Sequence, residues 1–155
     1  MSILRQILFA GLIAFPGVSF AQNIVATDAT SVANFFLEEG IEPSVEEDNT
    51  GDPKINVDYY GTDFSIFYYG CTNGQNCDSI QFFSGYRTDG GVRISKVNEW
   101  NANKRYAFAY ISEEGNARIE HDVFLGSVGM DPNDFAKLLG LWVRAQKEFE
   151  EHIGW

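Results

Sequence analysis

The two cysteines of the chain, Cys71 and Cys77, lie six positions apart. Redox-active pairs usually have the tighter Cys-x-x-Cys spacing, and a zinc site needs two further ligands. A structural disulfide is therefore the chemistry that this pair predicts, provided that the chain reaches an oxidising compartment. In the chain-entropy model, closing so short a loop contributes roughly 2 kcal/mol of stability.

Histidines and acidic residues give a weaker signal. His121 and His152 are the only histidines, and their separation fits no two-histidine ligand pair. Glu113-Glu114 and Glu46-Glu47-Asp48 could supply paired carboxylates for glycoside hydrolysis, but adjacent acids in turns are usually solvated. The acidic stretch 46–53 lacks calcium-loop spacing and is predicted to be a solvated turn. The chain has no Gly-x-Ser-x-Gly elbow and no phosphate loop. The sequence predicts a protein that is not an enzyme, without catalytic groups, metal site or cofactor.

Residues 1–21 have the organisation of a secretory signal peptide. Arg5 precedes an apolar run over 7–15, and the small residues Ser19 and Ala21 stand at positions −3 and −1 before Gln22. Nine apolar residues are too few to span a bilayer, which needs roughly 20. We therefore expect cleavage after Ala21, a periplasmic or secreted protein, and no membrane contact of the mature chain. Residues 22–27 are predicted to be a linker and residues 28–155 a single domain.

Charge and composition narrow the classes of partner. The chain has 22 acidic and 11 basic side chains, for a net charge of −11. Binding to a phosphate backbone or to anionic lipid needs clustered Lys and Arg, so neither nucleic acid nor an anionic membrane surface is an expected partner. Aromatic residues make up 15% of the chain, which is typical of a protein that folds around a core.

Alternating apolar residues between positions 55 and 86 predict an antiparallel meander. A type II′ turn at Gly61-Thr62 would place Tyr60 opposite Asp63, and a disulfide would place Cys71 opposite Cys77 in the next hairpin. Both registers gather the apolar residues on one face. The other face is polar but carries aromatic rings, and these form our candidate binding face: Tyr60, Phe67, Tyr69 and Phe83.

Helices are predicted on either side of this meander and after a further pair of strands. Residues 28–39 have helical spacing with Gly40 after them, a short helix is indicated around Val97 and Trp100, and a long final helix begins at the N-cap Asp131. Strands are expected over residues 105–110 and 118–123, joined by an acidic turn. The fold class is α+β, with N-terminal, short central and C-terminal helices packed on an antiparallel sheet.

The order of these elements resembles the YbjN domain family over about residues 28–150. The residues that carry the resemblance are Trp100, Asn101, Arg105, Tyr106, Phe108, Tyr110 and Gly115. The resemblance implies a fold similar to that of type III secretion chaperones and a role loosely described as sensory transduction regulation, and it brings no catalytic group with it. Predicted export and a disulfide distinguish this chain from cytoplasmic members of the family.

Two functions remain open from the sequence. The first is a non-catalytic, chaperone-like protein-binding or regulatory module, whose unknown partner is another protein or a second copy of the chain. The motivating feature is the aromatic outer face. The second is binding of a small apolar ligand in a pocket between Trp100, Trp142 and the sheet; both indoles filling the core is the simpler interpretation.

Overall fold

A computed structural model describes residues 22–155, and the predicted signal peptide over 1–21 lies outside the described residues. The elements are α1 (Ala29–Glu38), β1 (Ser44–Glu47), β2 (Pro53–Asp58), β3 (Asp63–Tyr69), β4 (Ser79–Tyr86), α2 (Ile94–Asn103), β5 (Phe108–Ile111), β6 (Ala117–Phe124) and α3 (Pro132–Ile153). The strands form one antiparallel six-stranded sheet in the order β1-β2-β3-β4-β6-β5. The predicted α+β class is confirmed.

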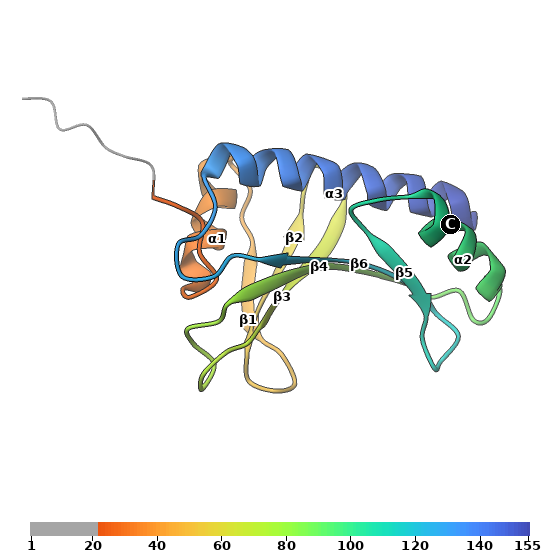
Figure 1. The fold of residues 1–155 in the computed structure, drawn as a ribbon, viewed down its shortest axis with the longest axis horizontal. Helices are drawn as coiled ribbons and strands as arrows, with labels where there is room; N and C mark the ends of the chain where they lie inside the picture. Colours follow the sequence, from red (N-terminus) through yellow and green to blue (C-terminus); the bar gives the residue numbers. More distant parts are fainter. Residues whose placement is uncertain (1–21) are drawn as a thin grey trace, which may run out of the picture.

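Within residues 22–155 the helices cover one face of the sheet, and none of them lies on the other face (Figure 1). Helix α3 runs across the sheet, with α1 and α2 towards its two ends (Figure 1). The meander covers β1 to β4, after which β6 inserts between β4 and the edge strand β5. Within residues 22–155 no helix combines the length and apolar character needed to cross a membrane.

The helix ends follow their sequence signals. The Asp131 carboxylate accepts a hydrogen bond of 2.8 Å from the backbone N–H of Asn133, and Pro132 occupies the first turn, where no backbone donor is needed. Asp28 caps α1 in the same way through Thr30. These local contacts explain why α1 and α3 begin where the sequence predicts.

The first hairpin differs from its predicted register. Its two-residue turn is Tyr60-Gly61, with φ of 51° and 82°, so Tyr59 rather than Tyr60 stands at the end of the ladder, opposite Thr62. Positive φ at both positions is the signature of a type I′ turn, whose twist matches that of the flanking strands. Asp63 consequently pairs with Asp58. The apolar residues still lie on one face, because moving the turn by one residue changes the partner of each strand residue by two positions.

The second hairpin is as predicted. Ile66 pairs with Phe82 and Tyr68 with Ile80, and a disulfide joins Cys71 to Cys77 beyond the ladder. The predicted disulfide is therefore present, in a loop that connects β3 to β4.

Three further segments depart from expectation. Three residues of the acidic stretch 46–53, predicted as a turn, belong to strands, because β1 pairs through Glu47 with Pro53, and residues 48–52 form the connection. Strand β5 begins at Phe108 rather than at residue 105, because Tyr106 has a left-handed φ of 65° that strand backbone does not adopt. In the predicted linker, Ile24 is buried and forms a bridge with Met130.

Aromatic side chains dominate the core between α3 and the sheet. The Trp142 ring stacks on Phe82 at a centroid distance of 5.6 Å, and Phe64 meets Trp142 edge-on at 6.1 Å. At the other end of α3, Phe149 packs against Trp100 of α2 at 5.1 Å. These pairs bury large apolar areas and fix α3 on the sheet, so that among residues 22–155 the opposite face is the one that no helix covers (Figure 1).

Candidate interaction surface

A ladder of rings and cations crosses the uncovered face of the sheet. The Lys54 ammonium lies 5.4 Å from the Phe67 ring centre, and the Phe67 and Phe83 rings meet edge-on at 5.5 Å. The Arg118 guanidinium then lies 5.9 Å from Phe83 and 5.8 Å from Tyr110. Each contact is attractive, and the five residues come from β2, β3, β4, β6 and β5, so the ladder also ties the strands together.

The structure brings three of the four predicted face residues together. Phe67 and Phe83 are half-buried within the ladder, whereas Tyr69, on the same strand as Phe67, keeps 45% of its surface exposed. Tyr60 lies elsewhere, in the turn between β2 and β3, where its hydroxyl contacts the Glu39 carbonyl at 3.4 Å. The face as observed is therefore centred on β3 and β4.

Sequence reasoning missed two exposed rings on this face. Phe108 of β5 and Phe124 of β6 are 43% and 75% exposed, and their strand positions align them with outward residues. Extending the alternation of Arg118, Glu120 and Asp122 by one step would have placed Phe124 on the same face. Together with Tyr69, they give the face three exposed aromatic side chains.

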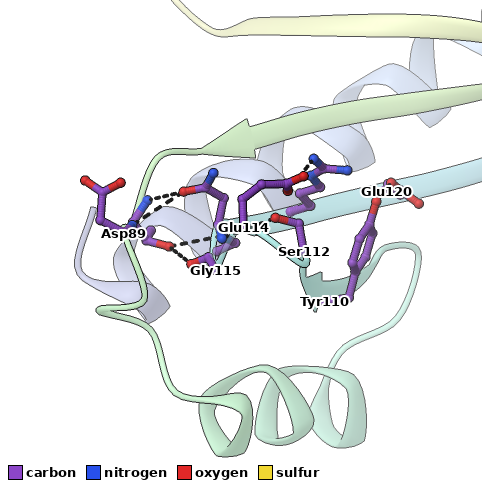
Figure 2. A network of polar contacts seen from close by, with 10 residues as sticks. Asp89, Tyr110, Ser112, Glu114, Gly115 and Glu120 are labelled. Carbon is purple, nitrogen blue, oxygen red and sulfur yellow. Dashed lines mark hydrogen bonds and ion pairs between the residues drawn. The ribbon is translucent and has the colours of Figure 1, made fainter.

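A buried carboxyl sits beside the ladder. Glu120 is 8% exposed and accepts a hydrogen bond of 2.5 Å from the Tyr110 hydroxyl (Figure 2). Burial raises the pKa of Glu120, while the Tyr110 hydrogen bond and the Arg118 charge act in the opposite sense. The charge of Asp122, the next outward residue of β6, also raises this pKa. The hydrogen bond to Tyr110 and the contact of Arg118 with the rings fit structural support of the face better than acid–base catalysis.

The residues of the predicted motif support β5 and the turn after it. The Trp100 indole N–H donates to the Ala107 carbonyl at 3.2 Å. The Asn101 amide accepts from the Ala109 N–H at 2.8 Å and donates to the Ala109 carbonyl at 2.9 Å. Its side chain thus bonds the outer edge of β5 as a neighbouring strand would.

Gly115 completes the same region. It has a φ of 80°, and its carbonyl accepts hydrogen bonds from the Thr88 hydroxyl and the Gly90 N–H, both at 3.0 Å (Figure 2). A Cβ atom there would lie 3.1 Å from the Gly90 nitrogen. The glycine therefore allows the β5–β6 turn to approach the loop after β4.

The other candidate residues form no reactive cluster. Within residues 22–155 no group of three His, Cys, Asp or Glu side chains is arranged to hold a metal ion. His121 is half-buried in β6, where burial lowers its pKa, and His152 contacts the Lys96 carbonyl near the end of α3. Trp100 and Trp142 are 1% and 0% exposed, so both indoles lie in the core.

Comparisons with known proteins agree with this architecture. A family model for YbjN, described as "Putative bacterial sensory transduction regulator", matches residues 28–155. A similar solved structure, "Crystal structure of YbjN, a putative transcription regulator from E. coli", has a TM-score of 0.56 and 12% sequence identity, covering 83% of this chain and 96% of that one. No curated protein matches the sequence. The structural likeness bears on the fold alone, but the family model spans most of the chain and confirms the resemblance read from the motif around Trp100: the protein belongs to the YbjN family.

Proposed function

We propose that this YbjN-family chain is an exported, non-catalytic binding protein that contacts a protein partner through the uncovered face of its sheet. The observation that carries the proposal is the set of exposed rings on that face, Tyr69, Phe108 and Phe124. Aromatic side chains supply large contact area at low entropic cost, and helices cover only the opposite face.

Charge supports a protein rather than a nucleic acid as the partner. The printed title of the E. coli relative calls that protein a putative transcription regulator. This chain has a net charge of −11, and two of the cations on its open face, Lys54 and Arg118, already lie against rings and pair with Glu46 and Glu114. Phosphate binding needs free clustered cations, so a regulatory role here acts through protein contact.

Export is the second part of the proposal. It rests on the pattern of residues 1–21, and a disulfide between Cys71 and Cys77 is compatible with an oxidising compartment. Intact-mass measurement of the protein from a periplasmic fraction tests it. A mature chain that begins at Gln22 supports export, whereas a full-length cytoplasmic product contradicts it.

The binding face is tested with paired variants. Phe67→Ser with Tyr69→Ser removes one half-buried and one exposed ring from the centre of the face, and Leu37→Ser with Val128→Ser removes two exposed apolar side chains elsewhere. Oxidised wild type and both variants are used for affinity capture from a periplasmic extract, with size-exclusion chromatography and light scattering to detect dimers.

We expect a partner held by the wild type and by the Leu37/Val128 control to be lost from the face variant while that variant remains folded. A dimer that dissociates in the face variant identifies a second copy as the partner. Equal capture by all three proteins contradicts the assignment of this face.

A further inference from the structure

The sheet has an edge segment that no strand of the described chain covers. Strand β6 pairs with β4 along its whole length, from Ala117 to Phe124, but it pairs with β5 only as far as Glu120. Over His121–Phe124 the backbone has no hydrogen-bond partner on the side away from β4 within residues 22–155. Unpaired strand edges of this kind are templates for another strand.

The gap exists because the motif before β5 directs the chain away from β6. Trp100 and Asn101 hold Ala107 and Ala109 through their side chains, and Tyr106 turns the backbone with its left-handed φ of 65°. A hollow of about 450 Å³ lies beside the exposed edge, lined by Asn101, by the linker that follows it, by Phe108 and by His121 and Asp122. The linker brings two cations, Lys104 and Arg105, to the hollow, and Lys104 is already paired with Glu148. An extended backbone therefore has space where β5 is missing.

The two outer edge strands of the sheet, β1 and β5, are each protected from pairing with a further strand, by different means. Strand β1 is fully exposed but ends in Glu46 and Glu47, and charges on an edge oppose pairing. Strand β5 has its Ala109 N–H and C=O occupied by Asn101. The His121–Phe124 edge has one charge, Asp122, and no side chain bonds its backbone on the open side within residues 22–155, although it is as long as the four-residue strands β1 and β5.

We propose that the His121–Phe124 edge binds an extended basic segment of a protein partner by strand addition. This inference rests on the proposed function as a protein-binding module and names the mode of contact. Asp122 and Phe124 point to the outer face, as do their neighbours on β4. A segment added here places one side chain opposite each of them, two positions apart.

The chemistry of these two positions defines the partner. One Asp122 oxygen accepts a hydrogen bond of 2.8 Å from Gln81, and within residues 22–155 Asp122 has no cationic partner. A Lys or Arg opposite it gains an ion pair, and an aromatic or β-branched residue opposite Phe124 covers a ring that is 75% exposed. The net charge of −11 also attracts a basic segment more than an acidic one.

The probe is the synthetic peptide acetyl-Thr-Lys-Thr-Phe-Thr-Lys-Thr-Phe-amide, added to the oxidised mature protein. Binding is measured by fluorescence anisotropy with a labelled copy, and the contacted backbone is located by hydrogen exchange. Two peptide controls are a Glu-for-Lys version and a fully N-methylated version with unchanged side chains. We expect slowed exchange within 121–124 and at least tenfold weaker binding of the N-methylated peptide, which cannot donate backbone hydrogen bonds.

Charge variants of the protein test the register. Asp122→Lys is expected to weaken the Lys peptide at least tenfold and to strengthen the Glu peptide. Glu38→Lys on the exposed side of α1 changes the net charge equally and is expected to have a much smaller effect. Equal binding of the N-methylated peptide, protection away from 121–124, or equal effects of the two variants overturns the proposal.

The two experiments distinguish a failure of the proposed edge site from a failure of the proposed function. A wild type that captures a partner through the Phe67/Tyr69 face, yet shows no peptide protection at 121–124, overturns the edge site and leaves the proposed function standing. A chain that captures no protein and forms no dimer contradicts the proposed function, whatever the peptide does.

Discussion

Replacing Asn101 by alanine removes both hydrogen bonds that the side chain makes to Ala109, at 2.8 and 2.9 Å. Ala109 is only 3% exposed, so its backbone groups cannot turn to water without local opening. Two lost bonds cost about 1 kcal/mol each, and each buried group left unpaired adds a penalty of up to about 3 kcal/mol. Allowing for partial relaxation, we expect Asn101→Ala to lower the unfolding free energy by about 2–4 kcal/mol.

Urea unfolding of the oxidised protein, followed by tryptophan fluorescence, measures this loss, and thermal unfolding should show a Tm lower by about 10 °C. Asn103→Ala is the matched control, because its side chain bonds only the Glu99 carbonyl on the exposed surface of α2. We expect that control to stay within about 0.5 kcal/mol of wild type. A loss at Asn101 no larger than at Asn103 would refute the assignment of Asn101 as the cover of the β5 edge.

Three further predictions concern single features of the fold. Burial raises the folded-state pKa of Glu120, so its contribution to stability is lost as pH rises through that pKa; Glu120→Gln should therefore be more stable than wild type in urea at pH 7 and lose this advantage in acid. Replacing Cys71 and Cys77 by serine should lower the unfolding free energy by about 2 kcal/mol, measured the same way, and no change would contradict a stabilising bridge. Gly74→Ala combines a φ of 70° with a Cβ atom 2.7 Å from the Gly51 carbonyl oxygen, so we expect a loss of about 1–3 kcal/mol and faster hydrogen exchange over 48–52; unchanged exchange there would contradict the contact.

Local signals account for the parts of the fold that the sequence predicts well. The start of α3 is set by Asp131 and Pro132, which act on the first turn whatever packs above it. The second hairpin is fixed by its disulfide and by alternation on both strands. Such features depend on residues a few positions apart, so a single sequence contains the information.

The first hairpin shows where local rules fail. Gly61 invites a type II′ turn with Thr62, but the structure places Tyr60 at a positive φ instead, a position for which Asn or Gly is the usual residue. The packed face decides this case. In the observed register Ile55 pairs with Ile66 and Val57 with Phe64. The predicted turn would instead pair Ile55 with Tyr68 and Val57 with Ile66. The choice between two turns that preserve the same face depends on contacts with α1 and α3, which a pattern of alternation does not contain.

The open edge of β6 is the clearest case of a feature that only the tertiary structure can reveal. A strand that began at residue 105, as the alternation of aromatic and alanine residues predicts, would have paired with β6 well beyond Glu120 and covered the edge. The observed strand starts at Phe108, because Trp100 and Asn101 hold the chain from α2 and Tyr106 turns it aside. The same contacts that cover the outer edge of β5 therefore expose His121–Phe124. Lengthening β5, for example by Tyr106→Val, which disfavours the left-handed φ, should protect the 121–124 amides in the free protein and weaken peptide binding together; protection without weaker binding would separate the edge from recognition.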